Sequence, residues 1–327
     1  MGKPVDMVEV WRGDLLESVH QGHAVVCDDL GQIVQCWGDP DKLIFPRSSC
    51  KMVQALPLVE SGIALSDEQL ALACASHSGA AIHIDRVGAW LRDLGLTDDD
   101  FRCGPQMPRD PAIKTALIKS DQTPCQIHNN CSGKHAGFLH LTQHIGAGPD
   151  YELIDHPIQQ LCKSAFEETV QETSPLYGID GCSAPNHACT LHGLARSMAF
   201  FASAHDRSDA RSTAASRLVQ AMAAHPALVA GEGRACTELM RAMQGKVTIK
   251  TGAEGVFTAI IPEKRLGVAV KAADGSTRAA ECVIAAILVK LGVLDALHPA
   301  AIARMNPPIA NRRGTVTGHI RPAAALR

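Results

Sequence analysis

The chain has 327 residues, of which 46% are hydrophobic and 20% are charged, and its formal net charge at pH 7 is -3. This composition is typical of a protein with a large apolar core, and it excludes the strongly basic surface that nucleic acid or an anionic membrane requires. Charges are spread through the first 23 residues, which argues against a secretory or transit peptide. We therefore expect a cytoplasmic protein with a small-molecule ligand, no nucleic acid and no membrane.

The beginning of the chain has the pattern of β-strands. Two short β-prone runs within residues 22–40 are joined by Asp28, Asp29, Leu30 and Gly31, which is the chemistry of a hairpin turn. We expect a sheet lobe built from about residues 1–47 and from about residues 245–327.

Helical patterns dominate from about residue 48 to residue 244. Ser66 and Gln69 have the spacing of a capping box, which marks the start of a helix. Residues 83–95, 156–173 and 191–204 repeat apolar side chains at helical spacing. We expect these residues to form a helical lobe.

The last third of the chain returns to alternating patterns. Residues 256–261 and 266–272 flank a short turn, residues 276–292 read as one Ala-rich helix, and Thr315–Ile320 reads as a short edge strand. The chain therefore predicts a single α+β domain over residues 1–327, in which an antiparallel sheet lobe packs against a helical lobe with the site in the cleft.

Ser48 and Lys51 form a Ser-x-x-Lys sequence before an apolar run. On a helix that starts near Ser49, positions three apart share a face, so Lys51 could accept the proton of a nucleophilic Ser48. The same residues also suit a simple structural role, with Ser48 or Ser49 as the N-cap of a buried helix. The motif alone leaves both interpretations open.

Lys250, Thr251 and Gly252 lie on a predicted strand near the end of the chain. Ser-x-x-Lys followed by Lys-Thr-Gly is the order found in penicillin-recognising serine enzymes. A lysine that is partly desolvated beside another lysine has the lowered pKa that a general base needs. The alternative is a solvated lysine before a glycine turn.

A third group of candidate residues lies in the sequence HNNCSGKHAGFL, which places Cys131, Lys134 and His135 close together. Further along, GIDGCSAP adds Asp180 and Cys182. Two thiolates and a nitrogen suit zinc, although the spacing is that of no zinc finger and a lysine ligand must lose its proton. Ordinary buried cysteines are the other interpretation of these thiols.

Taken together, the segments RSSCKMVQALPLVESG, ASHSG, CGPQMPRD, HNNCSGKHAGFL, GIDGCSAP, RACTELM and KTGAEGVF resemble the asparaginase II family, from about residue 8 to the C-terminal tail. The resemblance implies a fold like that of serine β-lactamases and serine-dependent glutaminases. It also implies a homodimer and hydrolysis of L-asparagine to L-aspartate and ammonia.

The resemblance assigns roles to individual residues. It implies two catalytic pairs, Ser48 with Lys51 and Ser78 with Lys250. It implies a zinc site whose ligands are Cys131, Lys134 and Cys182. It implies Arg47, Asp180 and His135 as substrate-binding residues, with Asp180 and His135 also supporting the zinc ligands.

Three other functions remain open from the sequence. A penicillin-recognising hydrolase would share both lysine motifs. A non-catalytic zinc-binding or regulatory protein on the same scaffold would use the thiols structurally. A glutaminase would differ only in its pocket, because one methylene group is worth only about 1–3 kcal/mol of discrimination.

Overall fold

The computed structural model describes residues 2–327, which separate into two compact units. The first unit consists of the chain up to Ser49, Cys189–Ser203 and Glu238–Arg327, and the second of Cys50–Ala188 and Ala204–Thr237. Strands of one antiparallel sheet dominate the first unit and helices dominate the second, which confirms the predicted α+β class. Among the described residues, no helix has the length and apolar character needed to span a membrane.

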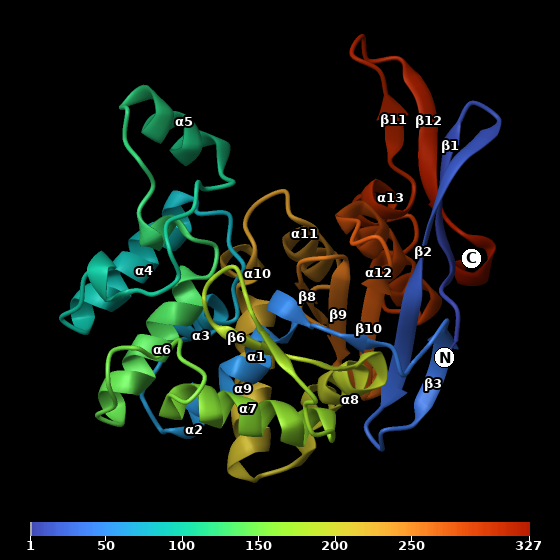
Figure 1. Ribbon diagram of the computed structural model, residues 1–327. Coiled ribbons are helices and arrows are strands. Elements are labelled where there is room, and N and C mark those ends of the chain that lie inside the picture. The colour runs from blue at the N-terminus through green and yellow to red at the C-terminus, as the bar shows by residue number, and fades with distance from the viewer. Residues whose placement is uncertain (1) are drawn as a thin grey trace. The chain divides into compact units, whose positions relative to one another are not determined.

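The first unit is built on an eight-stranded antiparallel sheet (Figure 1). Its strands follow the order β11-β12-β1-β2-β10-β9-β8, and β3 pairs with β2 beside this path. Their bounds are β1 Val5–Arg12, β2 Leu15–Asp28, β3 Ile33–Trp37, β8 Thr248–Thr251, β9 Val256–Ile261, β10 Leu266–Ala272, β11 Pro308–Ala310 and β12 Val316–Pro322. A short second ladder joins β4 (Leu43–Ile44) to β7 (Cys189–Thr190).

Apolar residues on both faces bury the centre of this sheet. All six residues of β9 are buried, which is the pattern of a strand with both faces covered. Helices α8 (Leu191–Ala202) and α12 (Thr277–Lys290) pack on β9 and β10. A Cβ atom at Gly267 of β10 would lie 2.2 Å from the carbonyl oxygen of Ala195 in α8, so only glycine permits this close approach of helix and strand.

The predicted hairpins of the sheet are present, with one correction. Residues 28–32 turn β2 into β3, and residues 262–265 join β9 to β10. The strand expected at Thr315–Ile320 is β12, but it is not an edge strand, because it pairs with β1 on one side and with β11 on the other. The three-residue β11 forms the edge. The sequence did not predict this strand, because it is short and lies among turn residues.

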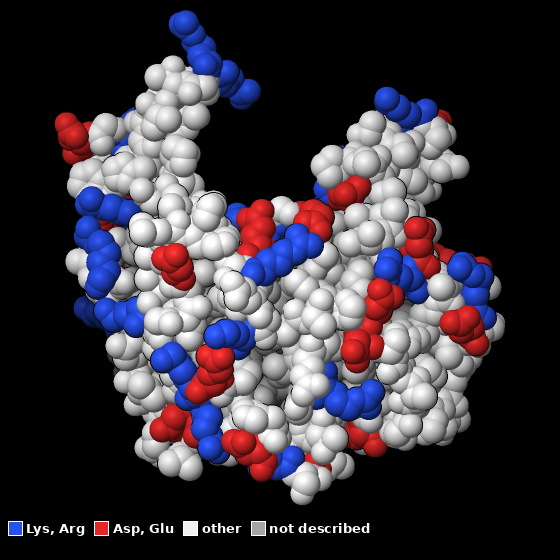
Figure 2. Space-filling model, turned by 180° about the vertical axis from the view of Figure 1, so that it is seen from behind, with Lys and Arg blue, Asp and Glu red and all other residues white. Residues whose placement is uncertain are grey.

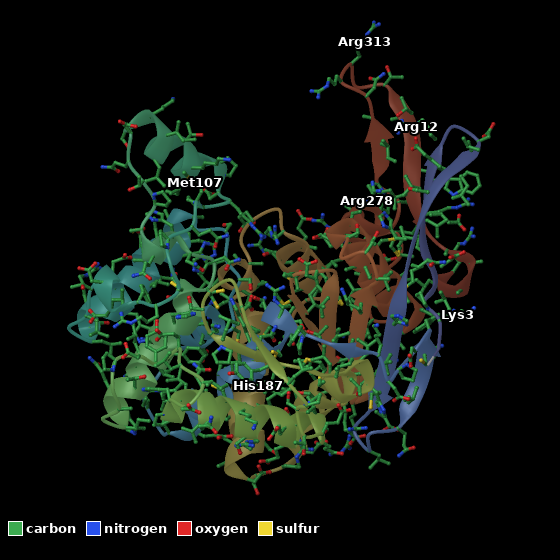
Figure 3. All side chains as sticks on the ribbon, in the orientation of Figure 1. Lys3, Arg12, Met107, His187, Arg278 and Arg313 are labelled. Carbon is green, nitrogen blue, oxygen red and sulfur yellow. The ribbon has the colours of Figure 1, made fainter. Side chains whose placement is uncertain are left out.

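Charged side chains of both signs are interspersed on the visible surface, and basic side chains lie at the end of the β11–β12 hairpin (Figure 2). Arg313, in the turn of that hairpin, points away from the sheet (Figure 3). This distribution agrees with the small net charge of -3.

The second unit contains most of the helices. Their bounds are α1 Lys51–Gln54, α2 Leu56–Glu60, α3 Asp67–Ala73, α4 Ala81–Asp93, α5 Pro111–Lys119, α6 Ser132–His144, α7 Pro157–Val170, α9 Ala210–Ala224 and α10 Pro226–Val229. The strands β5 (Tyr177–Ile179) and β6 (Pro185–His187) form a small hairpin. Helix α11 (Ala235–Ala242) begins in this unit and continues into the first.

Helix α6 forms the centre of the second unit. It packs against α2, α3, α4 and α7, and ten of its thirteen residues are buried. A helix that is buried on nearly all sides holds polar side chains only where they find partners, and α6 carries Ser132, Lys134 and His135 in its first two turns. Helix α3 begins with the predicted capping box of Ser66 and Gln69.

Candidate active site

Ser48 lies in a 3-10 turn, not at the cap of a helix. The turn spans Arg47–Cys50, and α1 starts only at Lys51 with no side-chain cap. Ser49 is fully buried and donates its hydroxyl to the carbonyl oxygen of Pro46 at 2.8 Å. The capping role expected for Ser48 or Ser49 is therefore wrong, because the backbone leaves the 3-10 turn before the α-helical hydrogen bonds begin.

Arg47 precedes Ser48 with a backbone φ of 55°. A residue with a side chain rarely adopts this left-handed conformation, and it costs on the order of 1–3 kcal/mol. Such strained residues cluster at functional sites, where the surrounding structure enforces them. The chain thus turns sharply immediately before Ser48.

The Lys-Thr-Gly strand lies beside this turn within the first unit. A Cβ atom at Gly252 would lie 2.6 Å from the carbonyl oxygen of Pro46 and 3.2 Å from the amide nitrogen of Ser49. The Thr258 hydroxyl lies within hydrogen-bonding distance of two carbonyl oxygens, that of Ser49 at 3.1 Å and that of Lys250 at 3.3 Å. Backbone contacts therefore hold the strand of Lys250 against the Ser48 segment.

Lys250 itself is 1% exposed and donates from Nζ to the carbonyl oxygen of Thr251 at 2.9 Å. A buried ammonium group needs hydrogen-bond acceptors around it, and the strand backbone supplies one of them. The predicted placement of Lys250 on a strand is confirmed.

Lys51 points into the second unit. Its Nζ atom donates to the carbonyl oxygen of Ala75 at 2.5 Å and to the sulfur of Cys131 at 3.1 Å. The side chain is 1% exposed. Lys51 therefore connects the Ser-x-x-Lys segment with the loop before Ser78 and with a predicted zinc ligand.

Ser78 lies in the loop between α3 and α4 and is 8% exposed. Its carbonyl oxygen accepts hydrogen bonds from the amides of Arg109 and Asp110, both at 2.9 Å. A Cβ atom at Gly231, whose φ is 112°, would lie 2.5 Å from the Ser78 hydroxyl. The loop and the backbone at Gly231 thus leave Ser78 little room to move.

The predicted zinc ligands converge in the second unit. Lys134 Nζ lies 3.2 Å from the sulfur of Cys182, and Cys131 and Cys182 are 5% and 3% exposed. The hydrogen bond between the two thiols raises the pKa of Cys131 and lowers the pKa of Cys182. Burial lowers the pKa of Lys134, but the charges of Cys182, Cys131 and Asp180 together with the hydrogen bond to Cys182 outweigh burial, so the net pKa is raised. The cluster thus places one amine beside two buried thiols.

His135 stands next to this cluster. Its Nδ1 atom lies 2.8 Å from the hydroxyl of Tyr151, and that hydroxyl also accepts from the amide of Arg102 at 2.8 Å. The Nε2 atom of His135 is buried and has no hydrogen-bond partner of ordinary geometry among the described residues. Burial lowers the pKa of His135 to about 4, although the hydrogen bond to Cys182 and the charge of Cys182 raise it.

Asp180 lies in the loop between β5 and β6, two residues before Cys182. Its carboxylate accepts from the amide of Gly181 at 2.7 Å, and its charge raises the pKa of Lys134. Asp180 is therefore near the thiol cluster, and its supporting role stays a prediction.

The donor set of this cluster fits a soft divalent ion. Two thiols and an amine of the second unit share one buried region, and thiols lose their protons readily to zinc. No group of three or more His, Cys, Asp and Glu side chains within residues 2–327 is arranged to hold a metal. The proposed ligands include only two residues of these types, because the third is Lys134, and the zinc site stays a prediction.

The structure assigns the predicted catalytic residues to different units. Ser48, Lys250 and Arg47 belong to the first unit, whereas Lys51 and Ser78 belong to the second. The pairings of Ser48 with Lys51 and of Ser78 with Lys250 stay predictions.

Sequence reasoning missed several residues that position these groups. Thr258 carried no motif of its own. The roles of Gly231 and Gly252 depend on which backbone approaches them in space. His77 lies in the ASHSG motif and Ser132 in HNNCSGKHAGFL, but the hydrogen bond between them gave no signal in the sequence.

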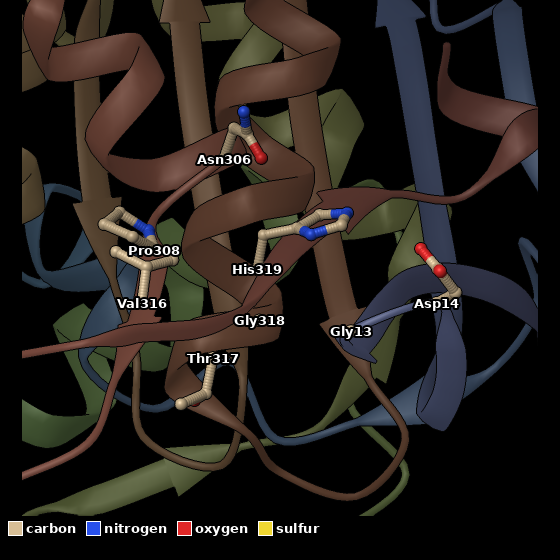
Figure 4. Close-up of a pocket in the computed structure, with 8 residues that line it drawn as sticks. All are labelled: Gly13, Asp14, Asn306, Pro308, Val316, Thr317, Gly318 and His319. Atoms are coloured by element: carbon tan, nitrogen blue, oxygen red, sulfur yellow. The ribbon is translucent and has the colours of Figure 1, made fainter.

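A separate cavity of about 560 Å³ lies in the first unit, at the base of the β11–β12 hairpin (Figure 4). Its lining includes Asp14, Asn306, Thr317 and His319, and none of the predicted site residues. We therefore do not assign the chemistry to it.

Comparison with known proteins gives a family. The model of the family described as L-asparaginase II matches residues 8–322, which is nearly the whole chain and includes every candidate residue described above. The chain belongs to the L-asparaginase II family. None of the curated proteins compared with the chain matches it.

Solved structures similar to this L-asparaginase II family member share little sequence with it. They include Mglu in its glutamate form, with 14% identity, a TM-score of 0.48, and coverage of 84% of this chain and 61% of that chain. Mglu in its native form has 13% identity, a TM-score of 0.46, and coverage of 92% and 70%. A beta-lactamase from Mycobacterium bovis has 10% identity, a TM-score of 0.34, and coverage of 82% and 94%. The chain thus spans less than two thirds of the first of these proteins.

Proposed function

We propose that the protein hydrolyses L-asparagine to L-aspartate and ammonia through an acyl-enzyme, with serine nucleophiles activated by lysines. One observation carries the proposal beyond the family match. The close approach of Gly252 to Pro46 and Ser49 brings the strand of Lys250 beside the segment of Ser48. Two motifs that are 200 residues apart in the sequence thus adjoin within one unit.

In the proposed reaction, Ser48 Oγ attacks the side-chain amide carbon of asparagine while Lys51 accepts the hydroxyl proton. The tetrahedral intermediate collapses, the C–N bond breaks, and Ser78 with Lys250 delivers a proton to the departing ammonia. Water then cleaves the ester on Ser48 and releases aspartate. The Lys51 amine donates to Ala75, in the loop before Ser78, and to Cys131, which holds the proposed base in one place.

Three charged or polar residues suit the binding of the amino acid. The guanidinium of Arg47 can hold the substrate carboxylate with two parallel hydrogen bonds. The strained backbone at Arg47 fixes where its side chain begins. Asp180 and His135 lie near the thiol cluster and support the polar end of the substrate.

Zinc would be held by Cys131, Lys134 and Cys182. When bound, it would supply a positive charge that orients the polar end of the substrate. A hydrogen bond from His135 lowers the pKa of Cys182, so His135 would stabilise a thiolate ligand by donating to it. Lys134 and the thiols must release their protons when zinc binds, so zinc affinity should fall at low pH.

We further propose that the enzyme is a cytoplasmic homodimer. The dimer follows from the family resemblance, and analytical ultracentrifugation of the purified protein tests it.

The decisive experiment measures ammonia release from L-asparagine and L-glutamine by the zinc-loaded wild type, Ser48→Ala and Ser78→Ala. We expect turnover of asparagine by the wild type, and a decrease of kcat of about 10³-fold or more in Ser48→Ala, because the nucleophile is lost. Ser49→Ala is the matched control: it removes the neighbouring hydroxyl, which is bonded to Pro46, and should retain turnover at a cost of about 1 kcal/mol of stability.

The outcomes separate the alternatives. Folding of each variant is checked by circular dichroism. If the folded, zinc-loaded wild type releases ammonia from neither amide, the proposed function is wrong and a non-catalytic zinc-binding role replaces it. Faster turnover of glutamine than of asparagine would make the protein a glutaminase with the same machinery.

A further inference from the structure

His77 links the loop of Ser78 to the first turn of α6. The imidazole is 1% exposed and lies directly before Ser78 in the chain. Its Nε2 atom lies 2.9 Å from the hydroxyl of Ser132, the first residue of α6. Ser132 follows Cys131 and precedes Lys134 by two positions. One hydrogen bond therefore joins the segment of a proposed catalytic serine to the segment of two proposed zinc ligands.

The hydrogen bonds around His77 fix its tautomer. The amide of Gly79 donates to Nδ1 at 3.1 Å, so in the neutral ring Nε2 carries the proton and donates to Ser132. Ser132 in turn donates to the carbonyl oxygen of Ile127 at 2.9 Å. Each group in this chain has its partner. The ring has no free nitrogen with which to accept a proton from a substrate.

A second contact connects the same two segments. The backbone amide of His77 donates to the carbonyl oxygen of Asn130 at 3.1 Å. The backbone hydrogen bond fixes the position of the loop at His77, and the side-chain hydrogen bond fixes the orientation of the imidazole. His83 stacks on the His77 ring with centroids 4.8 Å apart, which keeps the imidazole in its plane.

We propose that His77 is a positioning residue, which holds Ser78 in place relative to the first turn of α6 through its bond to Ser132. This inference rests on the proposed function, because that function gives Ser78 a catalytic role that depends on its position. His77 does not touch the substrate, since its side chain is buried and both ring nitrogens are engaged. A displaced serine loses reactivity steeply, because a shift of about 1 Å costs on the order of 100-fold in rate.

The first test uses variants that break the link at either end. In His77→Asn the shorter amide keeps an acceptor for Gly79 but does not reach Ser132, whereas His77→Gln extends far enough to donate to it. We expect His77→Asn and Ser132→Ala each to lower kcat by about 10- to 100-fold, with KM and zinc content nearly unchanged. The double variant His77→Asn/Ser132→Ala should be no slower than the worse single variant, because both remove one interaction. His77→Gln should recover part of the rate.

The control is Ser61→Ala, which removes a hydroxyl bonded to a helix carbonyl at 2.7 Å elsewhere in the second unit and should leave kcat unchanged. A second measurement reads the ring directly by ¹⁵N NMR of histidine-labelled wild type. We expect His77 in the Nε2–H form and no titration between about pH 5 and pH 8.

Each outcome decides the inference. Additive rate losses in the double variant, or a ring protonated on Nδ1, overturn it. If the wild type is active and the rate losses of the two single variants add in the double variant, only the positioning role is overturned. If the folded wild type releases ammonia from neither amide, the proposed function is overturned and the inference with it. Coupled losses with the Nε2–H form support it.

Discussion

The two serines of the proposed mechanism are held in place by different means. In the first unit, the segment of Ser48 is fixed by backbone geometry: a left-handed residue at Arg47 and a strand that approaches through Gly252. In the second unit, the loop of Ser78 is fixed by buried polar side chains next to the thiol cluster, among them Lys51 and His77. The first arrangement should therefore be sensitive to added volume, and the second to lost hydrogen bonds and to the metal.

The largest expected effect tests the dependence on the metal. Cys131→Ser replaces a proposed zinc ligand that Lys51 also contacts. We expect zinc affinity to fall by at least about 100-fold and KM for asparagine to rise by about 10- to 100-fold, with a smaller decrease in kcat. Zinc is measured by metal analysis after dialysis, and the kinetic constants by ammonia release.

Cys282→Ser is the matched control for this prediction. Cys282 is a buried thiol of the first unit, where burial raises its pKa to about 12. Its replacement should leave both zinc content and KM as in the wild type. Equal zinc content in Cys131→Ser and in Cys282→Ser would remove the thiol cluster from the proposal.

Much of the fold could be predicted from the sequence because its signals are local. Alternating apolar residues marked β9 and β10, and a capping box marked α3. The family motifs also named the residues of the thiol cluster, which the structure brings together within one unit. Side-chain spacing was enough for the strands and the helix cap, whereas the residues of the thiol cluster followed from the resemblance to the family.

The remaining features depend on contacts between distant segments. The 3-10 turn at Arg47–Cys50 replaced the expected helix cap, because Pro46 and Gly252 set the backbone there. The placement of β12 inside the sheet needed β11, which is only three residues long. The bond between His77 and Ser132 joins residues 55 positions apart, and no local pattern predicts such a pair.

A smaller effect is expected from volume added beside Ser78. Gly231→Ala places a methyl group 2.5 Å from the Ser78 hydroxyl at a φ of 112°. We expect a loss of about 2–3 kcal/mol in the free energy of unfolding and a lower kcat, because both strain and overlap are introduced. Gly233→Ala is the control in the same loop: its φ is 73°, but nothing lies within 4 Å of the added atom.

The two alanine variants separate strain from contact. Gly233→Ala should cost only about 1 kcal/mol, from backbone strain alone, with kcat unchanged. Urea denaturation gives the free energies, and ammonia release gives the rates. Equal losses of stability and equal rates in the two variants would show that the backbone at Gly231 does not constrain Ser78.

The smallest expected effect comes from one buried histidine at acidic pH. Burial lowers the pKa of His83, so this ring stays neutral in the folded protein, while in the unfolded chain it binds a proton below about pH 6.5. The unfolded state thus binds more protons, and the stability that His83 contributes is complete above pH 6.5 and is lost as pH falls toward the lower folded pKa.

His83→Gln keeps a donor for the carbonyl oxygen of Ala227 but cannot titrate. Urea denaturation of the metal-free protein at about pH 7 and pH 5 should show a drop in stability that is smaller by about 1 kcal/mol in His83→Gln than in the wild type. Burial also lowers the pKa of His23 in the first unit, so His23→Gln tests whether that unit shares the acid sensitivity. An identical drop in stability in wild type and His83→Gln would show that protonation of other groups controls acid unfolding. The buried polar side chains of the second unit would then not make that unit more sensitive to acid than the first.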